Sequence, residues 1–237
     1  MKAIGIIPAR YASSRFPGKP LADILGKSMI QRVYEQCKKA NSLSEVIVAT
    51  DDNRIFNHVI SFGGKALMTA TTHLSGTDRC NEVIQSLKTK YNIAINIQGD
   101  EPFINPEQID QVASLFNSEK VSIATLAKKI ENPTLLMDVN SPKAIFNNYG
   151  IAQNFCRSVA QIKPNQTYYK HIGIYGYRIQ TLAEICKLPP SANEKTERLE
   201  QLRWLDNGYK IKVGITTFES LSVDTPEDIG KIKAQMR

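Results

Sequence analysis

The segment IIPARYASSRFPGKPL, residues 6–21, begins as an apolar run and continues as a loop rich in proline and glycine. The run is part of KAIGIIPA, residues 2–9, and its nearly continuous apolar character is typical of a strand buried on both faces of a parallel sheet. The following loop carries three cations within ten positions, Arg10, Arg15 and Lys19. It matches neither GxGxxG nor GxxxxGK[ST], two common glycine-rich phosphate-binding patterns. The sequence therefore predicts an anion-binding loop of a different kind at the end of this strand.

The cations of this loop suit a small polyanion. Lys19 lies between Gly18 and Pro20, so we expect a turn that holds its backbone while its long side chain extends toward a triphosphate. Arg10 and Arg15 offer forked donors to phosphate oxygens. The alternative is a solvated surface loop, which would not need the prolines and the glycine that shape this segment.

Strands and helices alternate outward from the loop. Up to residue 116 the periodicity predicts strands at 2–9, 44–52, 65–69 and 92–102, and helices at 28–40, 53–64, 76–87 and 105–116. This order predicts an α/β fold with a mostly parallel central sheet flanked by helices. Ligands of such sheets bind at the carboxyl ends of the strands, where the loops 10–19, 51–53 and 98–102 are expected to converge.

The second half of the chain has a different pattern. It predicts strands at 121–130, 171–178 and 209–217, a pair of strands around the turn 147–150, and an exposed polar loop at 161–170. Helices are expected at 179–190, 193–208 and 223–237, the last of them capped by Asp224 or Thr225.

Two acidic residues follow predicted strands. Asp100 of NIQGDEPFI and Asp224 of VDTPED are placed to hold a divalent cation, because Mg²⁺ takes one or two protein carboxylates together with phosphate oxygens. The adjacent Glu101 is expected to point away from Asp100 on an extended backbone. Helix capping is the alternative role for Asp224. The segment SGTDR, residues 75–79, forms a turn before a helix and suits close contact with a base or a phosphate, although Thr77 or Asp78 could also be a cap.

The composition narrows the class of protein. The chain has 237 residues, 42% of them hydrophobic and 22% charged, and a net charge of +7. This charge is compatible with a nucleic-acid partner, but the basic residues are scattered and no nucleic-acid-binding motif is present, so no nucleic-acid partner is expected. The four cysteines are scattered without CxxC spacing, which favours reduced thiols. No segment is apolar enough to insert into a membrane and the start does not match a signal peptide, so we expect a cytoplasmic protein.

Six blocks of the sequence together resemble the 3-deoxy-manno-octulosonate cytidylyltransferase family, the CMP-Kdo synthetases: IIPARYASSRFPGKPL, THLSGTDR, NIQGDEPFI, HIGIYGYR, LEQLRWLDNGYKI and VDTPED. They follow the family's order and span nearly the whole chain, and the first and fifth are highly specific. The resemblance implies a nucleotide-diphospho-sugar transferase fold of the glycosyltransferase-A-like kind, with a dimerisation subregion and a homodimer. It also implies Mg²⁺-dependent transfer of CMP from CTP to 3-deoxy-D-manno-octulosonate (Kdo) for lipopolysaccharide biosynthesis, with release of pyrophosphate.

The resemblance also implies roles for individual residues within one domain, 1–237, that has a nucleotide-binding half at about 1–125 and a sugar-binding and dimerisation half at about 126–237. Residues implied to hold the nucleotide are Arg10, Arg15, Lys19, Ser75, Gly76, Arg79 and Gln98, of which Arg10 and Lys19 are also catalytic. Asp100 and Asp224 match the catalytic metal ligands. Residues implied to contact the sugar acid are Gln98, Arg157, His171, Tyr175, Glu200 and Gln201.

One segment departs from the family. Residues 154–162 read NFCRSVAQI, in which Asn154 and Cys156 replace a tyrosine and a serine while Arg157 is retained. Because this segment belongs to the sugar side, 8-amino-Kdo or another nonulosonic-type acid is the alternative acceptor. A nucleotide-binding module without catalysis and a basic nucleic-acid binder are the alternatives from other classes.

Overall fold

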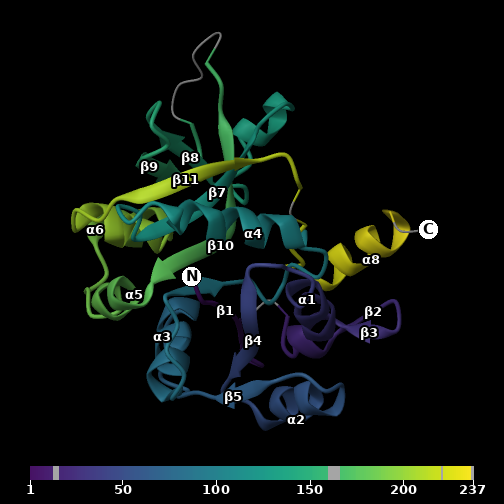
Figure 1. The fold of residues 1–237 in the computed structure, drawn as a ribbon. Helices are drawn as coiled ribbons and strands as arrows, with labels where there is room; N and C mark the ends of the chain where they lie inside the picture. Colours follow the sequence, from purple (N-terminus) through teal and green to yellow (C-terminus); the bar gives the residue numbers. More distant parts are fainter. Residues whose placement is uncertain (13–15, 160–165, 220, 236–237) are drawn as a thin grey trace. The chain divides into compact units, whose positions relative to one another are not determined.

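The computed structural model describes residues 1–12, 16–159, 166–219 and 221–235, whose helices and strands are labelled in Figure 1. The chain forms two compact units, one of Met1–Asp110 with Ser220–Arg237 and the other of Gln111–Glu219. These units differ from the expected halves at about 1–125 and 126–237, because the last residues fold with the first 110. The single-domain organisation stays a prediction. The fold is mixed α/β, with a mostly parallel sheet and flanking helices.

The first unit contains four parallel strands. Their order is β6 (Ile93–Asn96), β1 (Ala3–Ala9), β4 (Leu43–Thr50) and β5 (Ala66–Met68). The central strand β1 is buried almost throughout, as its apolar sequence predicted. β1, β5 and β6 lie within the predicted ranges, and β4 begins one residue before its predicted range 44–52.

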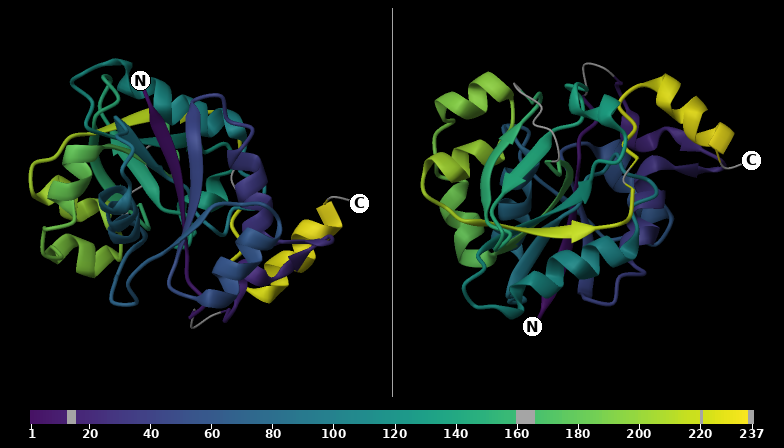
Figure 2. Two further views of the ribbon diagram at one scale, coloured as in Figure 1. Left: turned by 60° about the horizontal axis from the view of Figure 1, so that its bottom comes forward. Right: turned by 90° about the horizontal axis from the view of Figure 1, so that it is seen from above.

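The helices of the first unit cover both faces of this sheet. The chain runs outward from β1 through α1 (Met29–Cys37) and α2 (Asn53–Ser61), and it returns to β6 through α3 (Gly76–Ser86). Because parallel crossovers are right-handed, the reversal of direction places α3 on the face opposite α1 and α2. The left view of Figure 2 shows α1 and α3 on opposite sides of β1 and β4. The carboxyl ends of the strands stay open to ligands.

A small hairpin, which the sequence did not predict, follows the cationic loop. It consists of β2 (Asp23–Ile24) and β3 (Lys27–Ser28), joined by Leu25 and Gly26, which both have positive φ, 52° and 80°. The C-terminal helix α8 (Pro226–Gln235) packs beside it, as Figure 2 shows, with Ile24, Met29, Val223 and Ile232 in one buried cluster. This packing ties the end of the chain to its beginning.

The second unit is built on antiparallel pairs. Strand β10 (Tyr169–Arg178) pairs antiparallel with both β7 (Ile123–Lys129) and β8 (Lys143–Phe146). β8 pairs with β9 (Ala152–Cys156), which confirms the predicted strands around the turn 147–150. β11 (Ile211–Thr216) is parallel to β7. The remaining described helices are α4 (Pro106–Ser114), α5 (Ile179–Ile185), α6 (Ala192–Glu197) and α7 (Gln201–Asp206). The boundary between the two units falls within α4. Short 3-10 turns lie at Lys19–Leu21, Leu115–Asn117 and Pro133–Leu136.

The prediction of one helix over 193–208 is wrong. The segment forms two helices, α6 and α7, which are separated at Arg198, a residue with φ 54° and ψ 46°. The carbonyl oxygens of Glu197 and Arg198 accept hydrogen bonds from the side chain of Arg157. A side chain distant in sequence therefore takes the acceptors that a continuous helix would have used.

Candidate active site

A cavity of about 260 Å³ lies at the carboxyl edge of the first unit's sheet. Its wall comes from the end of β1, the 3-10 turn at Lys19, the start of α3 and the loop after β6. The lining residues are Pro8, Ala9, Arg10, Lys19, Pro20, His73, Leu74, Ser75, Gly76, Arg79, Gln98, Gly99 and Asp100. The structure thus brings together the two predicted loops 10–19 and 98–102 with the predicted segment SGTDR.

Two glycines let these segments approach each other closely. A Cβ atom on Gly99 would lie 2.8 Å from the carbonyl oxygen of Pro8, and a Cβ atom on Gly76 would lie 3.2 Å from Cγ of Pro8. Gly99 is therefore required where the loop after β6 meets the end of β1, and Gly76 makes a tight contact with the same proline. Backbone atoms can come close to a ligand on this floor.

Lys19 lies between the two predicted metal ligands. Its ammonium nitrogen is 2.7 Å from Oδ2 of Asp100 and 3.6 Å from Oδ1 of Asp224. Nζ also donates to the carbonyl oxygen of Val223 at 2.9 Å. The two carboxylates, which are 124 positions apart in the sequence, thus converge on one positive charge. The side chain of Lys19 is only 16% exposed, so this charge is partly shielded from water.

The turn that holds Lys19 has the expected geometry. Gly18 has φ 71° and its N–H donates to the carbonyl oxygen of Tyr11 at 2.9 Å. Residues Lys19–Leu21 then form a 3-10 turn with Pro20 in its first positions. Asp224 is brought in by the backbone of Val223, whose N–H donates to the carbonyl oxygen of Asp100 at 2.9 Å.

The pair of carboxylates suits a hard divalent cation. Both ligands are oxygen donors, and Mg²⁺ binds in proteins through one or two carboxylates plus substrate oxygens. The position between them is already one where a positive charge is favourable, because Lys19 lies there. Among the described residues no group of three or more His, Cys, Asp or Glu side chains is arranged to hold a metal ion. Mg²⁺ binding by Asp100 and Asp224 stays a prediction.

Three further predicted residues differ in how they are placed. Arg10 is exposed and lines the cavity, and Gln98 lines it from the loop after β6. Arg15 lies outside the described residues, so its role stays a prediction.

Ser75 begins α3 at the cavity. Its hydroxyl accepts a hydrogen bond from the N–H of Asp78 at 3.1 Å, and the Asp78 carboxylate accepts from the N–H of Ser75 at 3.2 Å. This capping box fixes the first turn of the helix, which begins with Gly76. The helix N-terminus and its partial positive charge therefore face the cavity.

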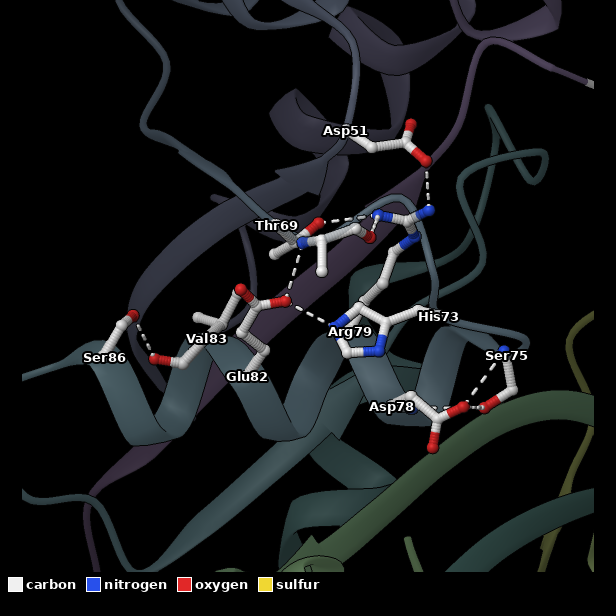
Figure 3. Close-up of polar contacts among 10 residues, drawn as sticks. Asp51, Thr69, His73, Ser75, Asp78, Arg79, Glu82, Val83 and Ser86 are labelled. Atoms are coloured by element: carbon white, nitrogen blue, oxygen red, sulfur yellow. Dashed lines mark hydrogen bonds and ion pairs between the residues drawn. The ribbon is translucent and has the colours of Figure 1, made fainter.

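Arg79 is held by the protein on several sides, as Figure 3 shows. It forms an ion pair with Asp51 and donates from Nη1 to Oγ1 of Thr69 at 2.6 Å and to the carbonyl oxygen of Ala70 at 3.2 Å. Its side chain is 4% exposed. Arg79 thus lines the cavity with an orientation fixed by β4 and the loop after β5, and contact with the cytidine stays a prediction.

His73 and Glu82 were missed by the residue-by-residue prediction, although His73 belongs to the block THLSGTDR. His73 lines the cavity, and its Nε2 is hydrogen bonded to Glu82. Glu82 also accepts from the N–H of Ala70 at 2.9 Å, and this bond, with a smaller contribution from His73, lowers the pKa of the Glu82 carboxyl group against the opposing effect of burial. The signal was a histidine directly before a capped helix, which is weak in isolation. Figure 3 shows this pair beside Arg79.

The residues predicted to contact the sugar acid, other than Gln98, belong to the second unit. His171 and Tyr175 are buried on β10, with ring centroids 5.3 Å apart. Burial lowers the pKa of His171 to about 3, so its ring is neutral at pH 7. The Thr125 hydroxyl lies 2.8 Å from the Ile174 carbonyl oxygen and 3.0 Å from Nε2 of His171. Because the hydroxyl has one proton to donate to that carbonyl, Nε2 of His171 is the donor to Thr125.

Glu200 and Gln201 lie at the start of α7. Gln201 is 5% exposed, and its Nε2 atom has no hydrogen-bond partner among the residues that the structure describes. Burial raises the pKa of Tyr175 well above its usual value, and the negative charge of Glu200 raises it further. The second unit therefore brings Tyr175 near Glu200, and the next residue, Gln201, has a buried amide donor.

Arg157 lies at the end of β9 and contacts backbone oxygens. Its Nε, Nη1 and Nη2 atoms donate to the carbonyl oxygens of Glu197, Val139 and Arg198 at 2.7, 2.9 and 3.2 Å. The predicted contact with a sugar carboxylate stays a prediction.

No helix in the described part of the chain is long and apolar enough to cross a membrane.

Comparison with known proteins gives a consistent result. The family model described as cytidylyltransferase matches residues 4–211. A 3-deoxy-manno-octulosonate cytidylyltransferase of Parabacteroides distasonis is 53% identical, with 99% of this chain and 98% of the relative covered. An 8-amino-3,8-dideoxy-manno-octulosonate cytidylyltransferase of Shewanella baltica is 47% identical, with 98% and 97% covered.

Solved structures agree with this result. The structure of a CMP:2-keto-3-deoxy-manno-octonic acid synthetase complexed with CTP is 41% identical and has a TM-score of 0.93, with 100% of this chain and 98% of that chain covered. A putative glucose-1-phosphate thymidylyltransferase of Bacillus anthracis, 16% identical with a TM-score of 0.69 and covering 99% and 95% of the two chains, shares the fold alone. The chain is thus a nucleotidyltransferase that belongs to the 3-deoxy-manno-octulosonate cytidylyltransferase family.

Proposed function

We propose that this enzyme transfers CMP from CTP to 3-deoxy-D-manno-octulosonate and releases pyrophosphate. The observation that carries the proposal is the convergence of Asp100 and Asp224 on Lys19 at the wall of a cavity lined by the cationic loop. Family membership supports the same reaction, as does the likeness to a synthetase bound to CTP.

The nucleotide is proposed to bind in the cavity of the first unit. Arg10, Arg15 and Lys19 would hold the triphosphate, because a guanidinium fork and an ammonium group match phosphate oxygens. Ser75 and Gly76 would contact the cytidine at the start of α3, where the close approach of Gly76 to Pro8 leaves backbone atoms accessible. Arg79 and Gln98 would complete the wall.

In the proposed reaction the anomeric hydroxyl of the sugar acid attacks the α-phosphorus, the bond to the bridging oxygen of pyrophosphate breaks, and the hydroxyl proton leaves to solvent. Asp100 and Asp224 would hold Mg²⁺, which supplies charge neutralisation and lowers the pKa of a coordinated hydroxyl. Arg10 and Lys19 stabilise the charge that develops on the leaving pyrophosphate. No side-chain nucleophile is required, because positioning and electrostatics provide the rate enhancement.

The acceptor is proposed to contact Gln98 and the second unit's His171, Tyr175, Glu200 and Gln201. The neutral His171 ring and the unpartnered amide of Gln201 are polar groups suited to sugar hydroxyls. An 8-amino acceptor is the second candidate, because a relative named for that substrate is 47% identical over nearly the full length. Direct competition between the two acids for limiting enzyme would separate the candidates.

We also propose a homodimer that works in the cytoplasm and supplies lipopolysaccharide biosynthesis. The second unit exposes apolar side chains on or beside its sheet, with Ile145 38%, Tyr149 80% and Ile215 57% exposed, and such residues favour an interface. Light scattering tests this proposal: Tyr149→Asp is expected to halve the mass in solution. Ile60→Asp, at a side chain that is 49% exposed on α2, serves as the matched control.

A pyrophosphate-release assay tests the reaction. The purified chain is given each of the four nucleoside triphosphates with Mg²⁺ and either Kdo, 8-amino-Kdo or no acid. Release is expected with CTP and Kdo together, and Asp100→Asn serves as the inactive control. Binding of CTP without release for any acid would instead identify a nucleotide-binding module, and retention on nucleic acid with a steep salt dependence would identify the third class.

A further inference from the structure

The side chain of Arg157 donates two of its three hydrogen bonds to the turn between α6 and α7. Nε donates to the Glu197 carbonyl oxygen at 2.7 Å and Nη2 donates to the Arg198 carbonyl oxygen at 3.2 Å. The backbone N–H of Arg157 donates to the Glu197 carboxylate at 3.0 Å. The Nε and Nη2 pair is the side of the guanidinium fork that would otherwise bind both oxygens of a carboxylate. In this protein that side is occupied by two successive carbonyl groups.

The turn that Arg157 contacts has an unusual backbone conformation. Arg198 has φ 54° and ψ 46°, a left-handed conformation that is unfavourable for a residue other than glycine. The hydrogen bonds from Arg157 offset this cost, because bonds from a charged donor are stronger than neutral ones. They keep α6 and α7 separate where the sequence pattern would continue one helix.

The end of this turn carries two residues of the proposed acid-binding set. Glu200 and Gln201 are two and three positions after Arg198 and open α7. The Trp204 ring, one turn further along, packs edge-on against the Tyr175 ring with centroids 5.1 Å apart. The direction in which α7 leaves the turn therefore decides where Glu200 lies relative to Tyr175.

Arg157 is itself held in place by a buried lysine. Lys143, which is 1% exposed, donates from Nζ to the carbonyl oxygen of Arg157 at 2.8 Å and to that of Asp138 at 2.7 Å. Nη1 of Arg157 donates to the neighbouring carbonyl oxygen of Val139 at 2.9 Å. Two cationic side chains thus join β8, β9 and the segment 138–139 to the α6–α7 turn, so the guanidinium is fixed and not mobile.

We infer that Arg157 is a positioning residue for the sugar acid: it fixes the α6–α7 turn and thereby Glu200 and Gln201, and it does not itself bind the acid's carboxylate. This inference rests on the proposed function for the identity of the acid. Its structural part, the clamp on the turn, does not depend on that function.

Arg178 provides a matched control. It belongs to the same unit and also donates to three carbonyl oxygens, from Nε to Val121 at 2.9 Å and from Nη2 to Phe116 and Ser118 at 3.2 and 3.1 Å. It contacts neither α6 nor α7 through these bonds. Arg157→Met and Arg178→Met therefore remove comparable bonds from different places.

The kinetic test is a double-mutant cycle on the KM for Kdo. Arg157→Met is expected to raise this KM roughly 10-fold while the KM for CTP changes less than about 2-fold, and Arg157→Lys is expected to recover part of the loss. Glu200→Gln is expected to add little once Arg157 is replaced, because both changes act through one arrangement. Fully additive effects of Arg157→Met and Glu200→Gln, or an equal rise of the KM in Arg178→Met, would overturn the inference.

Limited trypsin digestion tests the clamp without any substrate. Lys195 and Arg198 are exposed at the turn, so Arg157→Met is expected to accelerate cleavage there while Arg178→Met does not. If cleavage is accelerated but no acid yields pyrophosphate with the unmodified enzyme, the proposed function fails and the clamp stands. An unchanged rate of cleavage in Arg157→Met would show that Arg157 does not fix the α6–α7 turn, even if the enzyme uses Kdo.

Discussion

The ammonium group of Lys19 donates a hydrogen bond of 2.7 Å to Oδ2 of Asp100. The same group lies 3.6 Å from Oδ1 of Asp224, so one side chain neutralises two carboxylates that are 124 positions apart in the sequence. These three groups make the site depend on contacts that no local stretch of sequence contains. Their replacement separates a catalytic role from a structural one.

Lys19→Met retains most of the side chain's packing and removes its charge. We expect turnover to fall by about 10²-fold or more, because a preorganised cation at the phosphates is lost. The two carboxylates then face each other without their counter-charge, so Mg²⁺ is expected to raise the melting temperature of the variant more than that of the unmodified enzyme. Differential scanning fluorimetry with and without Mg²⁺ measures this difference. Equal shifts in both proteins would contradict the arrangement of charges described above.

Asp100→Asn and Asp224→Asn are each expected to fold normally, since the amide is nearly isosteric with the carboxylate. Each should reduce turnover by at least about 10²-fold, the scale of losing one preorganised electrostatic contact. The assay is pyrophosphate release at saturating Mg²⁺, with circular dichroism to check the fold. Turnover close to that of the unmodified enzyme would exclude that residue from the mechanism.

Gly99→Ala tests the close approach of the segments around Pro8. The new Cβ atom would lie 2.8 Å from a backbone oxygen, which cannot move away as a flexible side chain could. We expect a loss of roughly 1–3 kcal/mol in the free energy of unfolding, together with weaker CTP binding. Gly230→Ala in α8 is the control. Among the described residues, apart from its chain neighbours and the helix's own backbone, no heavy atom lies within 4 Å of its Cβ position, and alanine favours a helix. Similar losses of unfolding free energy in both variants would show that the close contact between Gly99 and Pro8 does not require glycine.

His171 makes the stability of the enzyme depend on pH. Its pKa is about 3 in the folded chain because of burial, against about 6.5 in the unfolded chain. Below pH 6.5 the unfolded state binds a proton that the folded state does not, so this contribution to stability is present above pH 6.5 and is lost as the pH falls toward 3. Between pH 7 and 5 the loss is about 2 kcal/mol. Urea unfolding of both proteins at pH 7 and pH 5 measures this effect. Between the two pH values the free energy of unfolding is expected to fall about 2 kcal/mol less in His171→Gln than in the unmodified enzyme. The same fall in both proteins would indicate that the ring is not buried in solution.

The sequence predicted the parallel strands of the first unit because their signal is local. Apolar runs such as Ile4–Ile7 identify buried strands, and the rule that ligands bind at the carboxyl ends places Arg10 and Asp100 at one edge. Both residues line the cavity in the structure. Periodicity was sufficient to locate these strands because each strand that is buried on both faces has its own continuous apolar run.

The elements that the sequence did not predict depend on distant partners. The break at Arg198 has no glycine or proline to indicate it, and it follows from carbonyl bonds to Arg157, 41 positions earlier. The hairpin at Asp23–Ser28 is too short for periodicity, although Gly26 is a weak turn signal. The orientation of Arg79 depends on its ion pair with Asp51, which directly follows β4. Helix capping at SGTDR gave no indication of this contact. Tertiary contacts decide all three features.

The packing of α8 beside the β2–β3 hairpin has a consequence during synthesis of the chain on the ribosome. Residues 1–110 emerge first and contain the cavity. Lys19 donates to the carbonyl oxygen of Val223, but Val223 and Asp224 are translated only after the whole of Gln111–Glu219. A chain that ends before residue 223 therefore has the cations of the cavity without the second carboxylate. If Asp224 has the proposed role, such an incomplete product is expected to sequester CTP without consuming it.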